Sequence, residues 1–428
     1  MNQQKEFLKS SLVAFIVRIL GALSGFLMNL IIARNLSVEQ SGLFFLGYAV
    51  CTFFSTVCML GLPNALIRFI GSYSTENNLS VVKGVFNKGV RTSFFFTLLF
   101  TILLYSFSGE ISNQVFGKES FKSTLQLFLL ALPFYVVIQL LGFSFQGLGK
   151  SVLTIICQNI AIQFIVILCI LLACLLSPNL SAENITVFFL CSCVMVCGIA
   201  FYKWLRTFNN AIKPDYSETK NLIESAKPLW VMMLVSALVE WSGQIVTGIY
   251  VSSEQVAFFS VAQRVAMLTS FVLIAVNLVA APRFAAISKK GDHSELRSLS
   301  LLCSRLMIFL ATPVLLFMLF FPEFILGFFG EDYKQASNIL RILVLGQFVN
   351  VITGSVGYLL NMSGHEREMR NVVLFSGPLA LILAFVLTPL YGTLGAAIAT
   401  AVALACQNLI AVYIVKKRLG FNTLNIIG

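Results

Sequence analysis

Residues 152–176 read VLTIICQNIAIQFIVILCILLACLL, a run of 25 residues without a charged side chain. A helix needs about 20 mostly apolar residues to cross the hydrocarbon core of a bilayer, so this stretch predicts one membrane-spanning helix. The apolar residues follow one another without alternation, whereas the strands of a membrane barrel alternate apolar and polar residues. The stretch therefore indicates an all-α integral membrane protein.

Similar stretches lie on both sides of it, and together they predict about twelve transmembrane helices. In the first half of the chain the predicted spans are 11–34, 42–66, 88–108, 124–146, 152–176 and 185–205. In the second half they are 228–250, 256–281, 299–321, 336–361, 370–389 and 393–415.

The composition also favours a membrane protein. Of the 428 residues, 58% are hydrophobic and 11% are charged, whereas about a quarter of the residues of a soluble domain are charged. The ten Cys lie in apolar stretches and form no C-x-x-C pair, so neither disulfides nor a metal site are expected. The first apolar stretch, after Lys5 and Lys9, is not followed by a signal-peptide cleavage site. This span is therefore expected to remain in the mature protein.

The basic residues predict the orientation in the membrane. With the N-terminus placed in the cytoplasm, 21 of the 29 Lys and Arg fall in inside segments, four in outside segments and four within spans. This bias alternates at every loop and predicts that both termini are cytoplasmic. The net charge of +11 therefore reflects topology, and no nucleic-acid partner is expected.

The chain matches itself at an offset of 215 residues. Residues 37–44, SVEQSGLF, align with residues 252–259, SSEQVAFF, and the same shift places Arg68-Phe69 on Arg283-Phe284. The polar stretch 203–227 then separates an N-terminal six-helix half, 1–210, from a C-terminal six-helix half, 211–428. Because each half has an even number of spans, a pseudo-twofold axis along the membrane normal is expected. Secondary transporters have this architecture, with the cargo site between the halves.

Ionisable side chains within a span are costly and therefore indicate function. Glu240 is the only acidic residue deep in a predicted span, and it shares a helix face with Ser236 and Gln244. Two interpretations stay open. The carboxylate binds a coupling ion or cargo, or it forms a structural ion pair or a helix-packing hydrogen bond.

The same offset relates that face to a small and polar face of the first span. The offset places Ser236, Glu240 and Gln244 on Gly21, Gly25 and Asn29 of the first span. Arg18 extends this stripe by one turn. Exposing either polar stripe to lipid costs free energy, so both stripes are expected to line a central cavity.

Cations outnumber carboxylates within the spans. Arg18 and Arg264 lie well inside theirs and are expected to hold an anionic group, since Arg is well shaped to bind phosphate. Arg305 and Arg341 lie closer to span ends, where snorkelling to the membrane surface is the alternative. The candidate cargo- or coupling-binding residues are Arg18, Asn29, Glu240, Gln244, Arg264 and Arg305.

Amide side chains add further polar groups to the spans. Their donors and acceptors suit sugar hydroxyls, and they also join helices to one another inside membranes. These amides are Gln158, Asn159, Gln163, Gln347, Asn350, Gln407 and Asn408.

No feature of the sequence indicates an enzyme. Residues 144–151, SFQGLGKS, end like a phosphate-binding P-loop, but Ser144 replaces the first Gly and no strand precedes the segment. No His-Glu-x-x-His motif occurs, and the loops are short. We expect no catalytic residue and no cofactor, apart from a proton or sodium ion as coupling ion.

Residues 32–44, IARNLSVEQSGLF, resemble the A-R-x-L-x-x-E-x-x-G-x-F run of the polysaccharide flippases. These belong to the multidrug/oligosaccharidyl-lipid/polysaccharide exporter superfamily. Residues 61–69, GLPNALIRF, are similar to the end of their second helix. The resemblance extends to the helix count, the duplication and the topology. Peptidoglycan-lipid flippases of this superfamily usually have fourteen spans, whereas this sequence predicts about twelve. The drug exporters of the superfamily often carry acidic residues in the spans of their first half. The predicted spans of the first half of this chain contain no acidic residue.

The resemblance implies a flippase of the cell inner (cytoplasmic) membrane. Its cargo would be polyprenyl-pyrophosphate-linked repeat units of O antigen or a similar surface polysaccharide, as in lipopolysaccharide biosynthesis, moved by alternating access. The implied partners are an undecaprenyl-type lipid-linked glycan, membrane lipid and the polysaccharide polymerase machinery. Two alternatives stay open, a cation-coupled multidrug or toxin exporter of the same superfamily and a non-transporting membrane scaffold or polymerase partner.

Overall fold

The structure is a computed structural model that describes residues 2–176, 179–208, 212–290 and 293–425. Nearly all of these residues lie in helices, and none of them lies in a strand. A helix satisfies its backbone N–H and C=O groups within one segment, as the interior of a bilayer demands. The predicted all-α class is confirmed.

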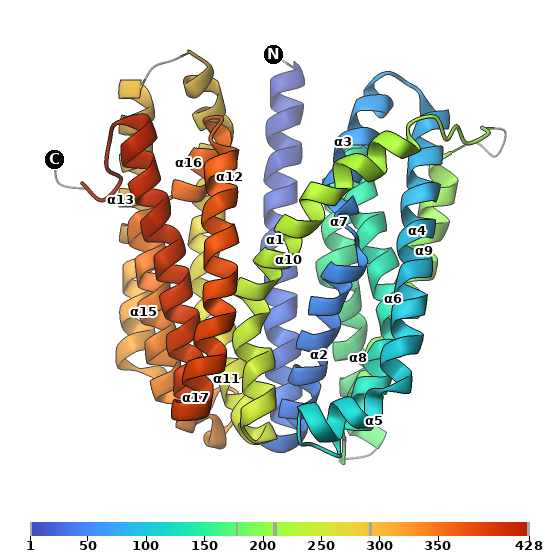
Figure 1. Cartoon of the computed structure of the whole chain (residues 1–428), viewed down its shortest axis with the longest axis vertical. Coiled ribbons are helices and arrows are strands. Elements are labelled where there is room, and N and C mark those ends of the chain that lie inside the picture. Colours follow the sequence, from blue (N-terminus) through green and yellow to red (C-terminus); the bar gives the residue numbers. More distant parts are fainter. Residues whose placement is uncertain (1, 177–178, 209–211, 291–292, 426–428) are drawn as a thin grey trace. The chain divides into compact units, whose positions relative to one another are not determined.

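The chain divides into two compact units, Met1–Leu234 and Val235–Gly428. In the first unit, drawn from blue to green in Figure 1, α6 packs against α2, α3, α4 and α9. The helices of this unit are α1 (Asn2–Asn35), α2 (Val38–Cys58), α3 (Leu62–Thr75), α4 (Leu79–Ser106), α5 (Ser108–Glu110), η1 (Ile111–Val115), α6 (Phe121–Gly147), α7 (Ser151–Ile155), η2 (Ile156–Ile160), α8 (Ala161–Leu176), α9 (Ala182–Thr207) and the first part of α10 (Thr219–Tyr250).

In the second unit, α15 packs against α11, α13 and α17. A buried cluster around Phe284, Leu359 and Val415 joins α12, α16 and the end of α17. The helices of this unit are the rest of α10, α11 (Ser253–Ala266), η3 (Met267–Thr269), α12 (Ser270–Lys290), α13 (His293–Phe320), α14 (Pro322–Gly327), η4 (Glu331–Ala336), α15 (Ser337–Thr353), α16 (Val356–Met362) and α17 (Glu366–Leu419).

Eleven of the described helical stretches are long and apolar enough to cross a membrane. One of them, α17, is 54 residues long and leaves helical geometry at Gly392, where φ is 59°. Its two parts match the predicted spans 370–389 and 393–415, so α17 supplies two crossings. The described residues thus agree with a chain of about twelve spans.

Two predicted spans are interrupted, and the sequence prediction of continuous helices was wrong there. Span 42–66 breaks after Cys58 because Leu60 and Gly61 have φ of 51° and 72°. A Cβ added to Gly61 would lie 2.1 Å from the backbone oxygen of Ala226, so only glycine fits. Span 336–361 breaks at Gly354, where φ is 73°.

Corresponding helices of the two units begin in the same way. The hydroxyl of Ser37 accepts a hydrogen bond from the backbone N–H of Gln40, and the hydroxyl of Ser252 accepts one from that of Gln255. Ser at this position satisfies a backbone donor that the first helical turn leaves unpaired. The two caps are 215 residues apart, which is the offset of the sequence alignment.

The segment between the predicted halves docks on the first unit. The backbone N–H of Asp215 donates to the Ser80 oxygen at 2.9 Å, and the Lys83 ammonium donates to the Ile212 oxygen at 2.9 Å. The indole N–H of Trp230 on α10 donates to the Val57 oxygen at 2.9 Å. These contacts hold the segment and the start of α10 on the first unit, which ends at Leu234 within α10.

We predict that Gly84→Val loosens this docking. A Cβ at position 84 would lie 1.7 Å from the Asp215 oxygen, so α4 and the segment must separate. Overpacking of this kind typically costs about 1–3 kcal/mol, and the melting temperature of the purified protein should fall. The control is Gly198→Ala on α9, where an added Cβ meets no atom within 4 Å. Equal melting temperatures for the two variants would contradict the docking.

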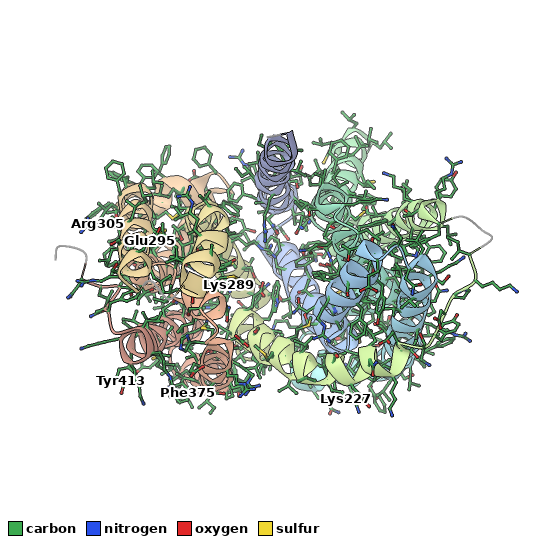
Figure 2. The ribbon with its side chains drawn as sticks, turned by 90° about the horizontal axis from the view of Figure 1, so that it is seen from above. Lys227, Lys289, Glu295, Arg305, Phe375 and Tyr413 are labelled. Carbon is green, nitrogen blue, oxygen red and sulfur yellow. The ribbon has the colours of Figure 1, made fainter. Side chains whose placement is uncertain are left out.

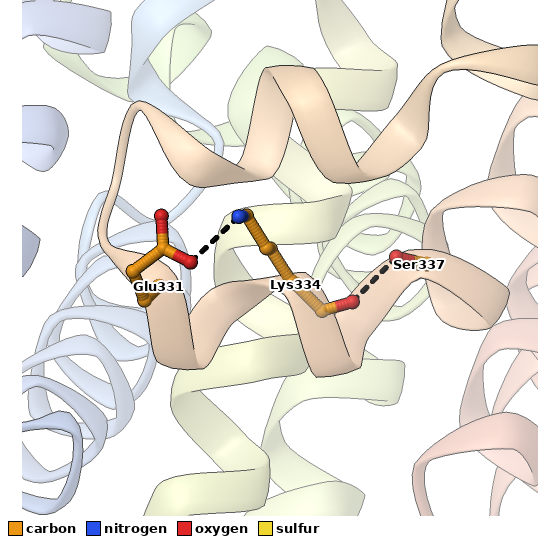
Figure 3. Close-up of polar contacts among 3 residues, drawn as sticks. All are labelled: Glu331, Lys334 and Ser337. Atoms are coloured by element: carbon orange, nitrogen blue, oxygen red, sulfur yellow. Dashed lines mark hydrogen bonds and ion pairs between the residues drawn. The ribbon is translucent and has the colours of Figure 1, made fainter.

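A short polar turn precedes α15 in the second unit. Figure 3 shows the ammonium of Lys334 in an ion pair with the Glu331 carboxylate at 2.6 Å, while the Ser337 hydroxyl donates to the Lys334 backbone oxygen. Both charged side chains are well exposed, so the pair contributes little to stability.

Candidate functional site

The second unit contains a cavity of about 260 Å³ lined by α10, α11, η3, α12, α15 and α17. The apolar part of its lining is Val239, Ala266, Met267, Leu343, Val373, Ala401 and Leu404. The polar part is Ser236, Glu240, Gln263, Ser270, Gln347, Asn350, Thr400 and Gln407. Such a density of hydrogen-bonding groups within spans is unusual, because each one is costly to bury in lipid.

Helical spacing brings these polar groups to one side of each helix. Gln347 and Asn350 are three residues apart on α15, and Thr400 and Gln407 are seven apart on α17. The helices also approach closely, since a Cβ added to Gly346 would lie 2.7 Å from the Cα of Ala401. Small residues at the crossing therefore bring the amides of α15 and α17 to one cavity.

The amides are joined by a partial hydrogen-bond network. Asn350 Nδ2 donates to Gln347 Oε1 at 3.2 Å. Gln263 Nε2 donates to the backbone oxygen of Glu240 at 3.2 Å, which ties α11 to α10. The Ser376 hydroxyl donates to Gln407 Oε1 at 3.0 Å. Each amide has more donor and acceptor positions than these bonds use, so the network can also bind a polar ligand.

Glu240 is the one charged residue in the lining of this cavity. The Lys334–Glu331 and Arg418–Glu368 ion pairs lie away from this cavity. The Glu240 side chain is accessible from the cavity that it lines. A carboxylate that faces an amide-lined cavity can hold a proton or a small cation, or accept hydrogen bonds from hydroxyl groups.

The remaining predicted residues of the second unit lie outside this lining. Gln244 is buried one turn beyond Glu240, and Arg264 is half-buried on α11 while its neighbour Gln263 lines the cavity. Arg305 is an exposed side chain of α13 (Figure 2). The cavity of the second unit therefore has no cationic side chain in its lining, and these cationic assignments stay predictions.

Two predicted residues belong to α1 of the first unit. Arg18 is exposed, and Asn29 is 3% exposed, with its amide N–H donating to the backbone oxygen of Gly25. Asn29 Oδ1 has no hydrogen-bond partner among the described residues. The predicted polar stripe of α1 is thus half exposed and half buried.

The prediction missed three polar residues of the cavity, Gln263, Ser270 and Thr400. Gln263, Met267 and Ser270 follow one another at helical spacing, so the signal was present on that face. The adjacent Arg264 was predicted instead, because a charged side chain within a span is the stronger signal of function.

Two family models match the chain. The model described as "Polysaccharide biosynthesis protein" matches residues 7–288, and the model described as "MatE" matches residues 228–386. A protein of Haloferax volcanii that bears the provisional name of a low-salt glycan biosynthesis flippase is 25% identical, over 94% of this chain and 82% of its own length. A protein of Shigella flexneri provisionally named an O-antigen transporter is 24% identical, over 86% of this chain and 87% of its own.

Solved transporter structures share the fold. An inward-facing multidrug resistance transporter of the MATE family, in the MOP superfamily, superposes with a TM-score of 0.79 at 12% identity over 96% of this chain and 98% of its own. The lipid II flippase MurJ in its inward closed conformation superposes with a TM-score of 0.73 at 16% identity over 96% and 87%.

Proposed function

Since the chain belongs to the polysaccharide biosynthesis protein family, we propose that it is a flippase for lipid-linked glycans. Its cargo is a polyprenyl-pyrophosphate-linked oligosaccharide repeat unit, which it carries from the cytoplasmic to the outer leaflet of the inner membrane. The relatives named for glycan flipping and O-antigen transport support this cargo class, because the likeness covers most of both chains.

The amide-lined cavity of the second unit is the observation that carries the proposal. Sugar hydroxyls both donate and accept hydrogen bonds, and the amides and hydroxyls of the lining offer the complementary groups. Its volume of about 260 Å³ is just below the range of about 300–1,000 Å³ found for small-molecule pockets. The cavity therefore holds a part of the glycan rather than the whole repeat unit.

In the proposed transport cycle the two ends of the cargo stay in different surroundings. The glycan occupies polar groups inside the protein while the polyprenyl tail stays in lipid, so neither end crosses an unfavourable medium. A change between inward and outward openings then moves the head group across by alternating access. Arg18, Arg264 and Arg305 remain the candidate ligands for the pyrophosphate, because guanidinium binds phosphate oxygens in pairs.

Glu240 is the proposed coupling residue. A carboxylate in a span is stabilised when it binds a proton or a sodium ion, so release of that ion on one side of the membrane gives the cycle a direction. The neighbouring side chains of Ser236 and Gln263 supply oxygen atoms that can act as further ligands of a cation.

A cation-coupled drug exporter is the second candidate function, because the MatE model matches residues 228–386, where most of the cavity helices lie. Deletion of the gene separates the two. We expect loss of long-chain surface polysaccharide, measured by gel electrophoresis of extracted glycan, and its return on complementation. Unchanged glycan together with a new sensitivity to cationic drugs would favour the exporter.

A further inference from the structure

The first unit contains a second and larger cavity, of about 720 Å³, that the proposed transport cycle does not use. Its apolar lining is Phe86, Val90, Phe94, Phe134, Val137, Cys197 and Phe201. Its polar lining is Asn87, Lys88, Arg91, Tyr216 and Thr219. The volume lies inside the range of about 300–1,000 Å³ that small-molecule pockets occupy.

The helices of the unit build this cavity as a groove. α4 and α9 both pack against α6 (Figure 1). Phe134 and Val137 of α6 form the floor of the groove. At one end the rings of Phe86 on α4 and Trp204 on α9 meet at 4.0 Å between centroids. Tyr216 and Thr219, from the docked segment and the start of α10, add a polar border.

The groove has two cations and an apolar floor. Lys88 and Arg91 are three residues apart on α4, so they project to the same side. Both side chains are exposed, and no carboxylate of the described residues lies within ion-pair distance of either. The Arg91 guanidinium lies 5.8 Å from the ring centroid of Phe95.

The nearby acidic groups are engaged elsewhere. The Glu218 carboxylate accepts a hydrogen bond from the side-chain amide of Asn221 at 2.7 Å. The Asp215 carboxylate accepts a hydrogen bond from the backbone N–H of Ser217. Neither carboxylate lies within ion-pair distance of Lys88 or Arg91, so both cations can pair with an outside anion.

We propose that this groove binds one anionic phospholipid of the cytoplasmic leaflet. The phosphate lies between Lys88 and Arg91, and an acyl chain follows the floor formed by Phe134 and Val137. Lys and Arg bind phosphate oxygens through charge-assisted hydrogen bonds, and the predicted topology places this end of α4 at the negatively charged cytoplasmic surface.

The lining distinguishes a phospholipid from the glycan end of the cargo. The cavity of the second unit has amides on three helices, whereas Asn87 is the only amide of the groove. Aromatic and aliphatic side chains offer an oligosaccharide few hydrogen bonds but suit a hydrocarbon chain. A lipid bound here touches both α4 and the start of α10 and so secures the docked segment.

Binding of phosphatidylglycerol to the purified full-length protein tests the proposal. Native mass spectrometry is compared for wild type, Lys88→Gln/Arg91→Gln and the control Lys220→Gln/Lys227→Gln. The control removes the same charge from two exposed positions outside the groove lining; Figure 2 labels one of them, Lys227. Each basic residue near the surface adds about 1 kcal/mol to anionic-lipid binding. Because the groove variant loses two that contact the lipid, we expect roughly thirtyfold weaker binding in that variant only.

A second variant separates the groove from simple charge. Cys197→Trp, on α9, fills the groove without changing its charge, and it should lower phosphatidylglycerol binding as well. Wild-type melting temperatures in lipid-free detergent verify that each variant folds. Equal binding by the groove variant and the control would overturn the proposal. So would wild-type preference for phosphatidylcholine, or binding of polyprenyl diphosphate with none of phosphatidylglycerol.

Discussion

Replacing Glu240 by Gln is expected to reduce glycan export roughly tenfold or more, because coupling free energies of about 1–3 kcal/mol correspond to factors of 5 to 150. Gln keeps the size and the hydrogen-bonding capacity of the side chain but cannot bind a proton or a cation. The variant should therefore insert and bind cargo, yet fail to respond to an imposed proton or sodium gradient. Transport in proteoliposomes with and without each gradient measures this response.

Two further substitutions sharpen the Glu240 experiment. Glu240→Asp retains the carboxylate one methylene further from the cavity and should recover part of the gradient response. Glu224→Gln removes a carboxylate from an exposed position on the same helix, outside the cavity, and should change nothing. Full gradient-driven export by Glu240→Gln would leave the proposed coupling role without support.

The double variant Gln347→Leu/Asn350→Leu is expected to weaken glycan binding by about 2 kcal/mol, or roughly thirtyfold, if it removes two hydrogen bonds to sugar hydroxyls. The two amides bond to each other, so replacing both leaves no buried partner unsatisfied. Stability should therefore change little while the cavity loses polar groups. The concentration dependence of transport in proteoliposomes measures the loss as a higher KM.

A matched pair of amides serves as its control. Gln335 and Asn338 have the same residue types at the same spacing, but both are exposed and lie outside the cavity. Gln335→Leu/Asn338→Leu should leave the KM for the glycan unchanged. If both double variants raise KM equally, the cavity does not bind the glycan.

The positions of the spans could be predicted from the sequence because hydrophobic length and loop charge act locally. The interruptions at Gly61 and Gly354 could not, since each depends on a distant segment. The oxygen of Ala226 excludes any side chain at position 61, and Ser304 Oγ lies 2.1 Å from an added Cβ at position 354. Local hydropathy contains no information about such close approaches.

The candidate site was predictable where polar residues share a helix face. Glu240 and Ser236 were placed on one face, and the amides Gln347, Asn350 and Gln407 were singled out, and all of them line the cavity. The choice between Gln263 and Arg264 was not predictable, because adjacent residues point about 100° apart and only packing fixes the rotation of α11. The groove beside Lys88 and Arg91 was not predictable, because it forms only once α4 and α9 pack on α6.

Transfer of a lipid-linked glycan between the leaflets of a reconstituted membrane tests the proposed function most directly. Purified protein is placed in liposomes containing a labelled polyprenyl-pyrophosphate oligosaccharide, and a membrane-impermeant glycosidase reports how much of it reaches the outer surface. A flippase makes nearly all of the glycan accessible, and Glu240→Gln slows this transfer. Accessibility that stays at the level of protein-free liposomes, while the same vesicles move a cationic dye, would contradict the assignment.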